Sequence, residues 1–264
     1  MAFASINGVV LHFRVEGRAD APSLVLANSL GTDARIWDRV ITQFTPRYRV
    51  VSYDKRGHGL SDAPPGDYRL DDHVDDLEGL LQHLGIERLA LAGVSVGGLI
   101  AQAYALRHPH RLAALVLCDT APKVGDAAMW SQRISAVRDN GLDAIVEPVM
   151  ARWFSEGFRS GRSVELAGWR NMFLRMPVDG YAGTCAALRD ADLRDAIGAI
   201  ATPTLVIVGE QDLSTPVDLV RSMAEAIVGA RFAIIPNCGH IPSIEQPQAL
   251  AAAMTQFLNE VGYD

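Results

Sequence analysis

The sequence predicts an α/β fold, with a mostly parallel, eight-stranded sheet covered by helices and a helical insertion. Three observations predict it. Short apolar runs rich in β-formers alternate with helix-like segments along most of the chain. The first two runs flank Asn7-Gly8, a pair that favours a tight hairpin turn, so the sheet is expected to begin antiparallel. The alternation then stops between residues 122 and 200, where no convincing strand is found.

The strands are expected at eight short apolar runs. They are residues 3–6, 9–15, 24–27, 49–53, 89–92, 114–118, 205–208 and 232–235. Helix-like segments separate most of the later runs. One of them, residues 71–84, carries its leucines and a valine on one face and acids along the other. Strands that alternate with helices form a parallel sheet with both faces covered.

The segment without strands contains three tryptophans and several helix-like stretches. We therefore expect a core domain made of residues 1–121 and 201–264, and a helical cap made of residues 122–200. An insertion that follows a strand end would lie above the strand ends and cover whatever site is there.

Composition and charge exclude several classes of protein. The formal net charge of −7 argues against a nucleic-acid partner. Residues 89–106 carry no charge, but glycines and polar residues interrupt them, so we expect a buried strand and helix and no membrane span. The N-terminus lacks the basic flank and apolar run of a signal peptide, which predicts a cytoplasmic protein. The three cysteines have no metal-ligand spacing. The oligomeric state stays open.

Residues 93–97 read Gly-Val-Ser-Val-Gly and lie between a predicted strand and a helix-like segment. In this context a serine hydroxyl projects from the edge of a sheet. A serine nucleophile needs a base, and the base needs an acid that orients it. His240 and Asp212 each follow a predicted strand, so we predict Ser95 as nucleophile, His240 as base and Asp212 as acid. Asp119 also follows a strand and is the alternative acid.

The tetrahedral intermediate of such a reaction needs two preorganised N–H donors. The Val96 N–H, directly after the serine, is one candidate. The loop after the predicted strand 24–27 should supply the other, for which we choose the Leu30 N–H.

Five segments, in this order, resemble the α/β-hydrolase fold family over nearly the whole chain. They are residues 28–31 (Asn-Ser-Leu-Gly), 54–61 (Asp-Lys-Arg-Gly-His-Gly-Leu-Ser), 93–97, 209–212 (Gly-Glu-Gln-Asp) and 239–240 (Gly-His). Residues 28–32, residues 119–125 with the Trp130 and Arg133 that follow, and residues 180–192 are further similar to bacterial 3-oxoadipate enol-lactonases.

The resemblance implies opening of 3-oxoadipate enol-lactone to 3-oxoadipate in aromatic catabolism (the β-ketoadipate pathway), without cofactor or metal. The substrate would be a small anionic lactone. Residues 122–194 hold ten Lys or Arg and nine Asp or Glu, and nine of the ten cations are Arg, which suits a carboxylate. We expect Arg133 to bind that carboxylate and Trp130 to form an apolar wall, with simple packing as the alternative for Trp130.

Three alternatives stay open. A carboxylesterase or a carbon–carbon bond hydrolase of the same fold would use the same three residues. From a different class, a ligand receptor could keep the fold and use the pocket for binding alone.

Overall fold

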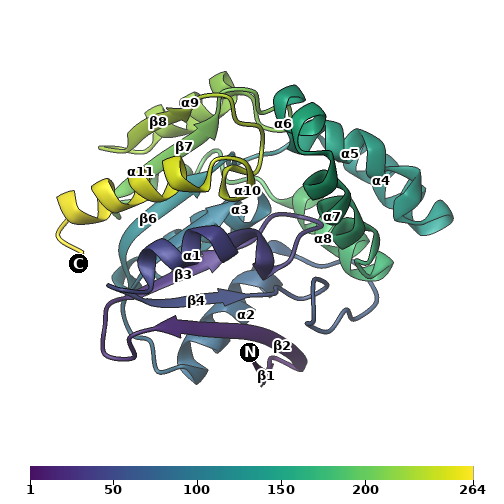
Figure 1. Ribbon diagram of the computed structural model, residues 1–264. Coiled ribbons are helices and arrows are strands. Elements are labelled where there is room, and N and C mark those ends of the chain that lie inside the picture. The colour runs from purple at the N-terminus through teal and green to yellow at the C-terminus, as the bar shows by residue number, and fades with distance from the viewer. Residues whose placement is uncertain (264) are drawn as a thin grey trace.

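The computed structural model describes residues 1–263. Its centre is an eight-stranded sheet in the order β1-β2-β4-β3-β5-β6-β7-β8 (Figure 1). The strands are β1 (Ala2–Ile6), β2 (Val9–Gly17), β3 (Ser23–Ala27), β4 (Arg49–Tyr53), β5 (Leu89–Val94), β6 (Leu112–Cys118), β7 (Thr204–Gly209) and β8 (Arg231–Ile235). Strand β2 is antiparallel to both of its neighbours, and all other pairs are parallel. The predicted fold class is confirmed.

The first two strands form the hairpin that the Asn-Gly pair predicts. Asn7 and Gly8 have φ angles of 50° and 81°, and Ile6 pairs with Val9 across the turn. Both turn residues lie in the left-handed region, which asparagine and glycine tolerate best.

The central strands are buried along their whole length because helices cover both faces of the sheet. Val25 of β3, Leu91 of β5 and Leu115 of β6 lie side by side in register at the centre of this core. The continuous apolar runs of the sequence are therefore the signature of strands with no solvent-facing side.

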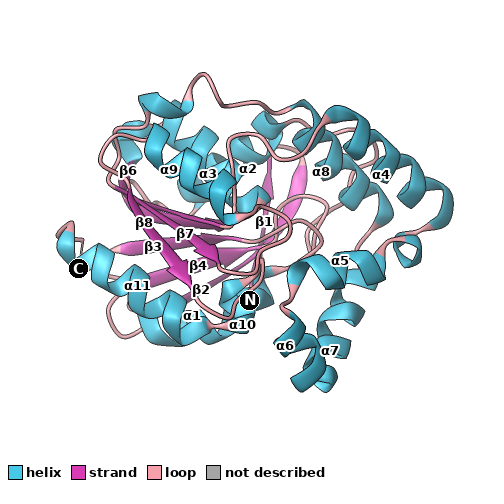
Figure 2. Ribbon diagram, turned by 90° about the horizontal axis from the view of Figure 1, so that it is seen from above, coloured by secondary structure: helices cyan, strands magenta, loops and turns pink. Residues whose placement is uncertain are grey.

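Two layers of helices enclose the sheet (Figure 2). Helices α2 (Leu70–His83), α3 (Val96–Arg107) and α9 (Val217–Ala226) cover one face, and α1 (Asp38–Phe44), α10 (Pro242–Glu245) and α11 (Pro247–Glu260) cover the other. Short 3-10 helices are η1 (Ala34–Trp37), η2 (Pro109–Arg111), η3 (Leu142–Ala144) and η4 (Ile197–Ala199). No helix within residues 1–263 has both the length and the apolar character needed to cross a bilayer.

The segment between β6 and β7 is helical and extends beyond the sheet (Figures 1 and 2). Its helices are α4 (Ala127–Asn140), α5 (Val146–Trp153), α6 (Glu156–Gly161), α7 (Ser163–Leu174) and α8 (Val178–Asp190). Helix α8 packs on α4 and also touches the loop after β4, where a Cβ on Gly180 would lie 2.1 Å from the Gly57 carbonyl oxygen. We call these helices the cap; the domain bounds given above stay a prediction.

Candidate active site

Ser95 occupies a sharp turn between β5 and α3. Its φ and ψ angles of 59° and −120° are strained for a residue with a side chain, and such strain is stored at functional turns. The flanking glycines allow the turn to close. A Cβ on Gly93 would lie 2.2 Å from the Gly97 carbonyl oxygen, and a Cβ on Gly97 would lie 2.4 Å from the Ala27 carbonyl oxygen. The motif therefore also brings the loop after β3 close to the start of α3.

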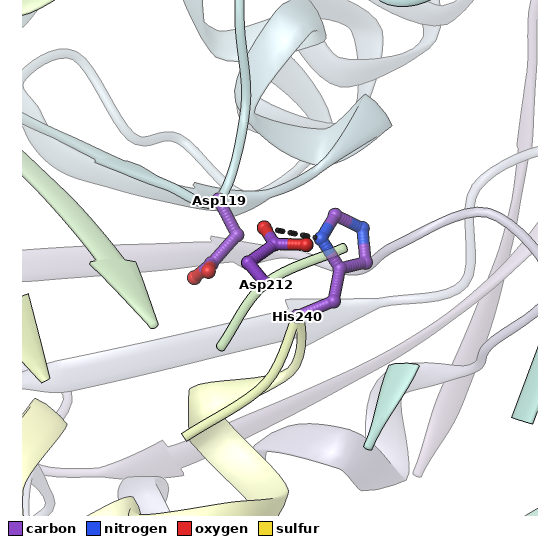
Figure 3. A group of neighbouring side chains, drawn as sticks. All are labelled: Asp119, Asp212 and His240. Atoms are coloured by element: carbon purple, nitrogen blue, oxygen red, sulfur yellow. Dashed lines mark hydrogen bonds and ion pairs between the residues drawn. The ribbon is translucent and has the colours of Figure 1, made fainter. Parts of the chain in front are cut away.

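His240 and Asp212 form a buried pair. His240 lies in the loop between β8 and α10, and its Nδ1 is 2.8 Å from Asp212 Oδ2 (Figure 3). The Asp212 carboxylate also accepts the N–H groups of Ser214 and Thr215 and the Thr215 hydroxyl. Burial opposes the charge of Asp212, but His240 and the Thr215 hydrogen bonds outweigh it and lower the pKa of this carboxyl. Asp212 can thus hold one nitrogen of the imidazole and leave the other for chemistry.

Ser95 and His240 line the same cavity, which has a volume of about 210 Å³. No hydrogen bond joins Ser95 Oγ to His240 in the structure. Hydrogen bonds of this kind are often long before substrate binds and tighten in the complex. The structure therefore places the predicted nucleophile and base around one space and leaves their direct contact a prediction.

Asp119, the alternative acid, lies beside this pair but does not bind the imidazole. Asp119, Asp212 and His240 each offer an atom within 4.8 Å of the others (Figure 3). Asp119 Oδ1 accepts the Gly209 N–H at 2.8 Å, while Oδ2 is buried without a partner in residues 1–263. Burial and the charge of Asp212 raise the pKa of Asp119 well above its ordinary value, which favours its neutral form. This cluster fits a cation poorly, because His240 Nδ1 and Asp212 Oδ2 are already hydrogen-bonded to each other.

Two backbone N–H groups are available as oxyanion donors. The Val96 N–H lies at the start of α3, where the helix dipole favours negative charge, and Leu30 lines the cavity from the loop after β3. Neither N–H donates to an acceptor within residues 1–263. Both predicted donors are therefore free, and their role stays a prediction.

The family is decided by comparison with known proteins. A sequence model described as the Alpha/beta hydrolase family matches residues 24–253. The chain belongs to this family. It is 37% identical over 246 residues to 3-oxoadipate enol-lactonase 2 of Acinetobacter baylyi, covering 93% of this chain and 92% of that protein.

Two solved structures resemble this hydrolase closely. The enol-lactonase from Burkholderia xenovorans LB400 superposes with a TM-score of 0.95 at 37% identity, covering 98% of this chain and 100% of that one. A thermophilic esterase from Thermogutta terrifontis, with malate bound, superposes with a TM-score of 0.93 at 29% identity, covering 98% of each chain. These likenesses support hydrolase activity and leave the substrate open.

Trp130 and Arg133 of the hydrolase both line the cavity from α4. Trp130 is buried, and its Nε1 donates to the Val124 carbonyl oxygen at 2.7 Å. The Arg133 guanidinium carbon lies 5.1 Å from the centre of the Trp130 ring, within the range of a cation–π contact. Trp130 thus packs within the cap and also lines the cavity, and its ring contacts the Arg133 guanidinium.

Sequence reasoning missed Arg152, which lines the same cavity from α5. Neither Arg133 nor Arg152 forms an ion pair with any residue in the range 1–263, so two guanidinium groups border the cavity without a fixed counter-charge. Nothing in the sequence distinguishes Arg152 from the other cap arginines, since only the fold of α5 brings it here.

The cap is also joined to the histidine loop through its backbone. The His240 N–H donates to the Trp153 carbonyl oxygen at 2.9 Å. A Cβ on Gly239 would lie 2.6 Å from that same oxygen, so the loop and the end of α5 are in direct contact. The position of the imidazole is therefore tied to α5 as well as to Asp212.

Proposed function

We propose that this hydrolase is a serine-dependent enol-lactonase that opens 3-oxoadipate enol-lactone to 3-oxoadipate. The observation that carries the proposal is the arrangement of Ser95, the His240–Asp212 pair and two unpaired arginines around one cavity. The names of two relatives support it, since both are enol-lactonases. The related esterase was solved with malate bound, and malate, like the proposed substrate, carries negative charge.

In the first half of the reaction, Ser95 Oγ attacks the lactone carbonyl carbon while His240 takes the hydroxyl proton. The carbonyl oxygen becomes an oxyanion, which the N–H groups of Leu30 and Val96 stabilise by roughly 3–4 kcal/mol each. The ring C–O bond then breaks. The His240 imidazolium gives its proton to the departing enolate, which becomes a ketone and leaves the imidazole neutral. The ketone stays attached to Ser95 because acyl and leaving group belong to one molecule.

In the second half, His240 removes a proton from water, and the resulting hydroxide attacks the acyl carbon of Ser95. A second tetrahedral intermediate collapses, Ser95 recovers its proton from the imidazolium, and 3-oxoadipate leaves. Asp212 stabilises the imidazolium in both halves through the bond to Nδ1. No step requires a cofactor or a metal.

The side-arm carboxylate of the lactone would bind the cap cations. Arg133, held over Trp130, is the proposed partner, and Arg152 adds positive charge at the same cavity. This is what separates the proposal from a general carboxylesterase, which would need no unpaired cation in the cap. Ultraviolet-monitored hydrolysis of the enol-lactone beside neutral aryl esters distinguishes the two, and a strong preference for the lactone is expected.

Ser95→Ala tests the nucleophile. We expect the variant to keep the fold and to lose at least about a thousandfold in turnover of the enol-lactone. Circular dichroism and the melting temperature check the fold, and progress curves at high enzyme concentration measure the residual rate. Activity near the wild-type value would remove Ser95 from the mechanism.

A further inference from the structure

Lys55 is a buried lysine with no acidic partner. It follows β4, its exposed fraction is 2%, and no carboxylate of residues 1–263 lies within ion-pair distance of its Nζ. The Nζ instead donates to two backbone carbonyl oxygens, that of Asn28 at 3.2 Å and that of Ser29 at 2.7 Å. Both belong to the loop that carries Leu30.

Because the peptide group is planar, the contact of Lys55 with the Ser29 carbonyl also determines where the Leu30 N–H points. In a planar trans peptide the C=O of one residue and the N–H of the next point in opposite directions. No peptide bond of the described chain is cis, so the Ser29 carbonyl and the Leu30 N–H point to opposite sides of the loop. When Lys55 holds the carbonyl oxygen on the core side, the N–H points away from Lys55. Leu30 lines the cavity, and its N–H has no acceptor within residues 1–263.

Neighbouring contacts fix the loop from the same side. The Thr32 hydroxyl donates to the Ser29 carbonyl oxygen at 2.9 Å, and the Gly31 N–H donates to His58 Nε2 at 3.0 Å. These bonds hold the residues on either side of Leu30, and the contact from Lys55 is the shortest to the Ser29 oxygen.

Filling space does not account for a lysine at this position. Burial opposes its charge and, with only partial compensation from Asp54 and Asp33, lowers the pKa of Lys55 well below its ordinary value. An unbranched apolar side chain such as methionine would fill the same volume without that cost. What methionine cannot do is donate hydrogen bonds to two carbonyl oxygens.

We propose that Lys55 is a positioning residue that orients the Ser29–Leu30 peptide so that the Leu30 N–H faces the cavity as an oxyanion donor. The inference rests on the proposed function, in which Leu30 is one of the two donors. Lys55 touches neither substrate nor nucleophile and acts through the backbone.

Lys55→Met tests the proposal with p-nitrophenyl acetate as substrate and phenylboronic acid, which forms a tetrahedral adduct with an active serine, as inhibitor. We expect kcat/KM to fall about 10- to 100-fold, less than the 10²–10³-fold loss typical when a donor is deleted. The Ki of phenylboronic acid should rise by about the same factor, because the adduct uses the same donor. If Lys55 had a purely structural role, Lys55→Met would lower the melting temperature but leave kcat/KM and the Ki of the folded enzyme unchanged.

Lys123→Met is the matched control. Lys123 also donates to two backbone carbonyl oxygens, those of Arg189 and Ala191, each at 2.8 Å, but they lie at the end of α8 and away from the loop. This variant should lose comparable hydrogen bonds and keep kcat/KM and the Ki within about threefold of wild type. An equal effect of the two lysine variants on the Ki would overturn the proposal.

Two further variants cover the case in which Lys55→Met does not fold. Lys55→Gln keeps a shorter N–H donor and should retain more of kcat/KM than any apolar replacement. Thr32→Val removes a second donor from the Ser29 oxygen and should raise the Ki in the same direction by a smaller factor, and an unchanged Ki in both variants would refute the role of Lys55. Ser95→Ala separates the two hypotheses, because full activity in that variant defeats the proposed function, whereas a wild-type Ki in Lys55→Met defeats only the inference about Lys55.

Discussion

Within residues 1–263, two buried histidine–aspartate pairs lie near the same edge of the sheet, and only one of them borders the cavity that Ser95 lines. In the first, His240 Nδ1 lies 2.8 Å from Asp212 Oδ2; in the second, His12 Nδ1 lies 2.7 Å from Asp54 Oδ2. All four residues are at most 6% exposed. Each aspartate is further held by backbone N–H groups, Asp212 by two and Asp54 by those of Ala34 and Leu60.

The pairs differ in what surrounds the second nitrogen of the imidazole. His240 lines the cavity together with Ser95. His12 Nε2 is buried without a hydrogen-bond partner in residues 1–263, beside the ring of Phe3. An aspartate orients the imidazole in both pairs, so this contact alone does not make a histidine a catalytic base. The difference lies in the surroundings. Ser95 and Leu30 line the cavity with His240, whereas the Ser61 hydroxyl beside the second pair is bonded to the backbone of His12 and Asp54.

The largest expected effect comes from removing the charge of each aspartate in turn. Asp212→Asn should lower kcat about 10⁴-fold, because the imidazole then loses its fixed tautomer and the stabilisation of its charged form. Asp54→Asn should keep kcat within about threefold and lower the free energy of unfolding by about 1–3 kcal/mol, since one buried hydrogen bond is lost. Steady-state kinetics and urea unfolding measure both. Similar losses of activity in the two variants would contradict the conclusion that only the His240–Asp212 pair takes part in catalysis.

A smaller effect is expected from the arginines near each pair. Arg133 has no acidic partner in residues 1–263, whereas Arg35, near the second pair, binds Asp33. Arg133→Ala should raise KM for the anionic lactone by about tenfold or more and change KM little for a neutral ester of similar size. Arg35→Ala, the control, should alter neither. Equal changes for the two substrates would exclude Arg133 as the carboxylate partner.

The smallest expected effect is on the pH dependence of stability and comes from Asp119, the carboxyl beside the His240–Asp212 pair. Because the pKa of Asp119 is raised in the folded protein, the folded state binds more protons than the unfolded chain above pH ~4, and the free energy of unfolding falls as the pH rises through that range. Asp119→Asn cannot ionise and keeps an oxygen for the Gly209 N–H.

The Asp119→Asn variant should therefore gain stability relative to wild type as the pH rises from 4.5 to 8. Urea unfolding at the two pH values measures the difference. A difference that does not change with pH would mean that Asp119 ionises equally in both states.

Much of this architecture could be predicted because local rules determine it. The Asn7-Gly8 turn, the uncharged strand runs and the order of Ser95, Asp212 and His240 each depend on residues close together in sequence or on strand ends that must share one edge. For the same reason the helical character of the cap was visible as a loss of strand signals.

What could not be predicted depends on side-chain packing between distant segments. Sequence reasoning treated Asp119 and Asp212 as alternatives, but the fold places them side by side, with Asp212 bonded to the imidazole and Asp119 bonded to the Gly209 N–H. Lys55 lies in a polar, glycine-rich turn that suggests exposure, yet the loop after β3 closes over it. The second pair was equally hidden, because His12 and Asp54 meet only when β2 pairs with β4.

The hydrogen bond between the His240 N–H and the Trp153 carbonyl oxygen limits how the cap can move relative to the core. If the cap moved away from the core as one rigid body, that hydrogen bond would break and the His240 imidazole would lose its alignment. Movement of substrate and product into and out of the cavity therefore requires local shifts of side chains or of helices remote from α5, while the end of α5 stays in place.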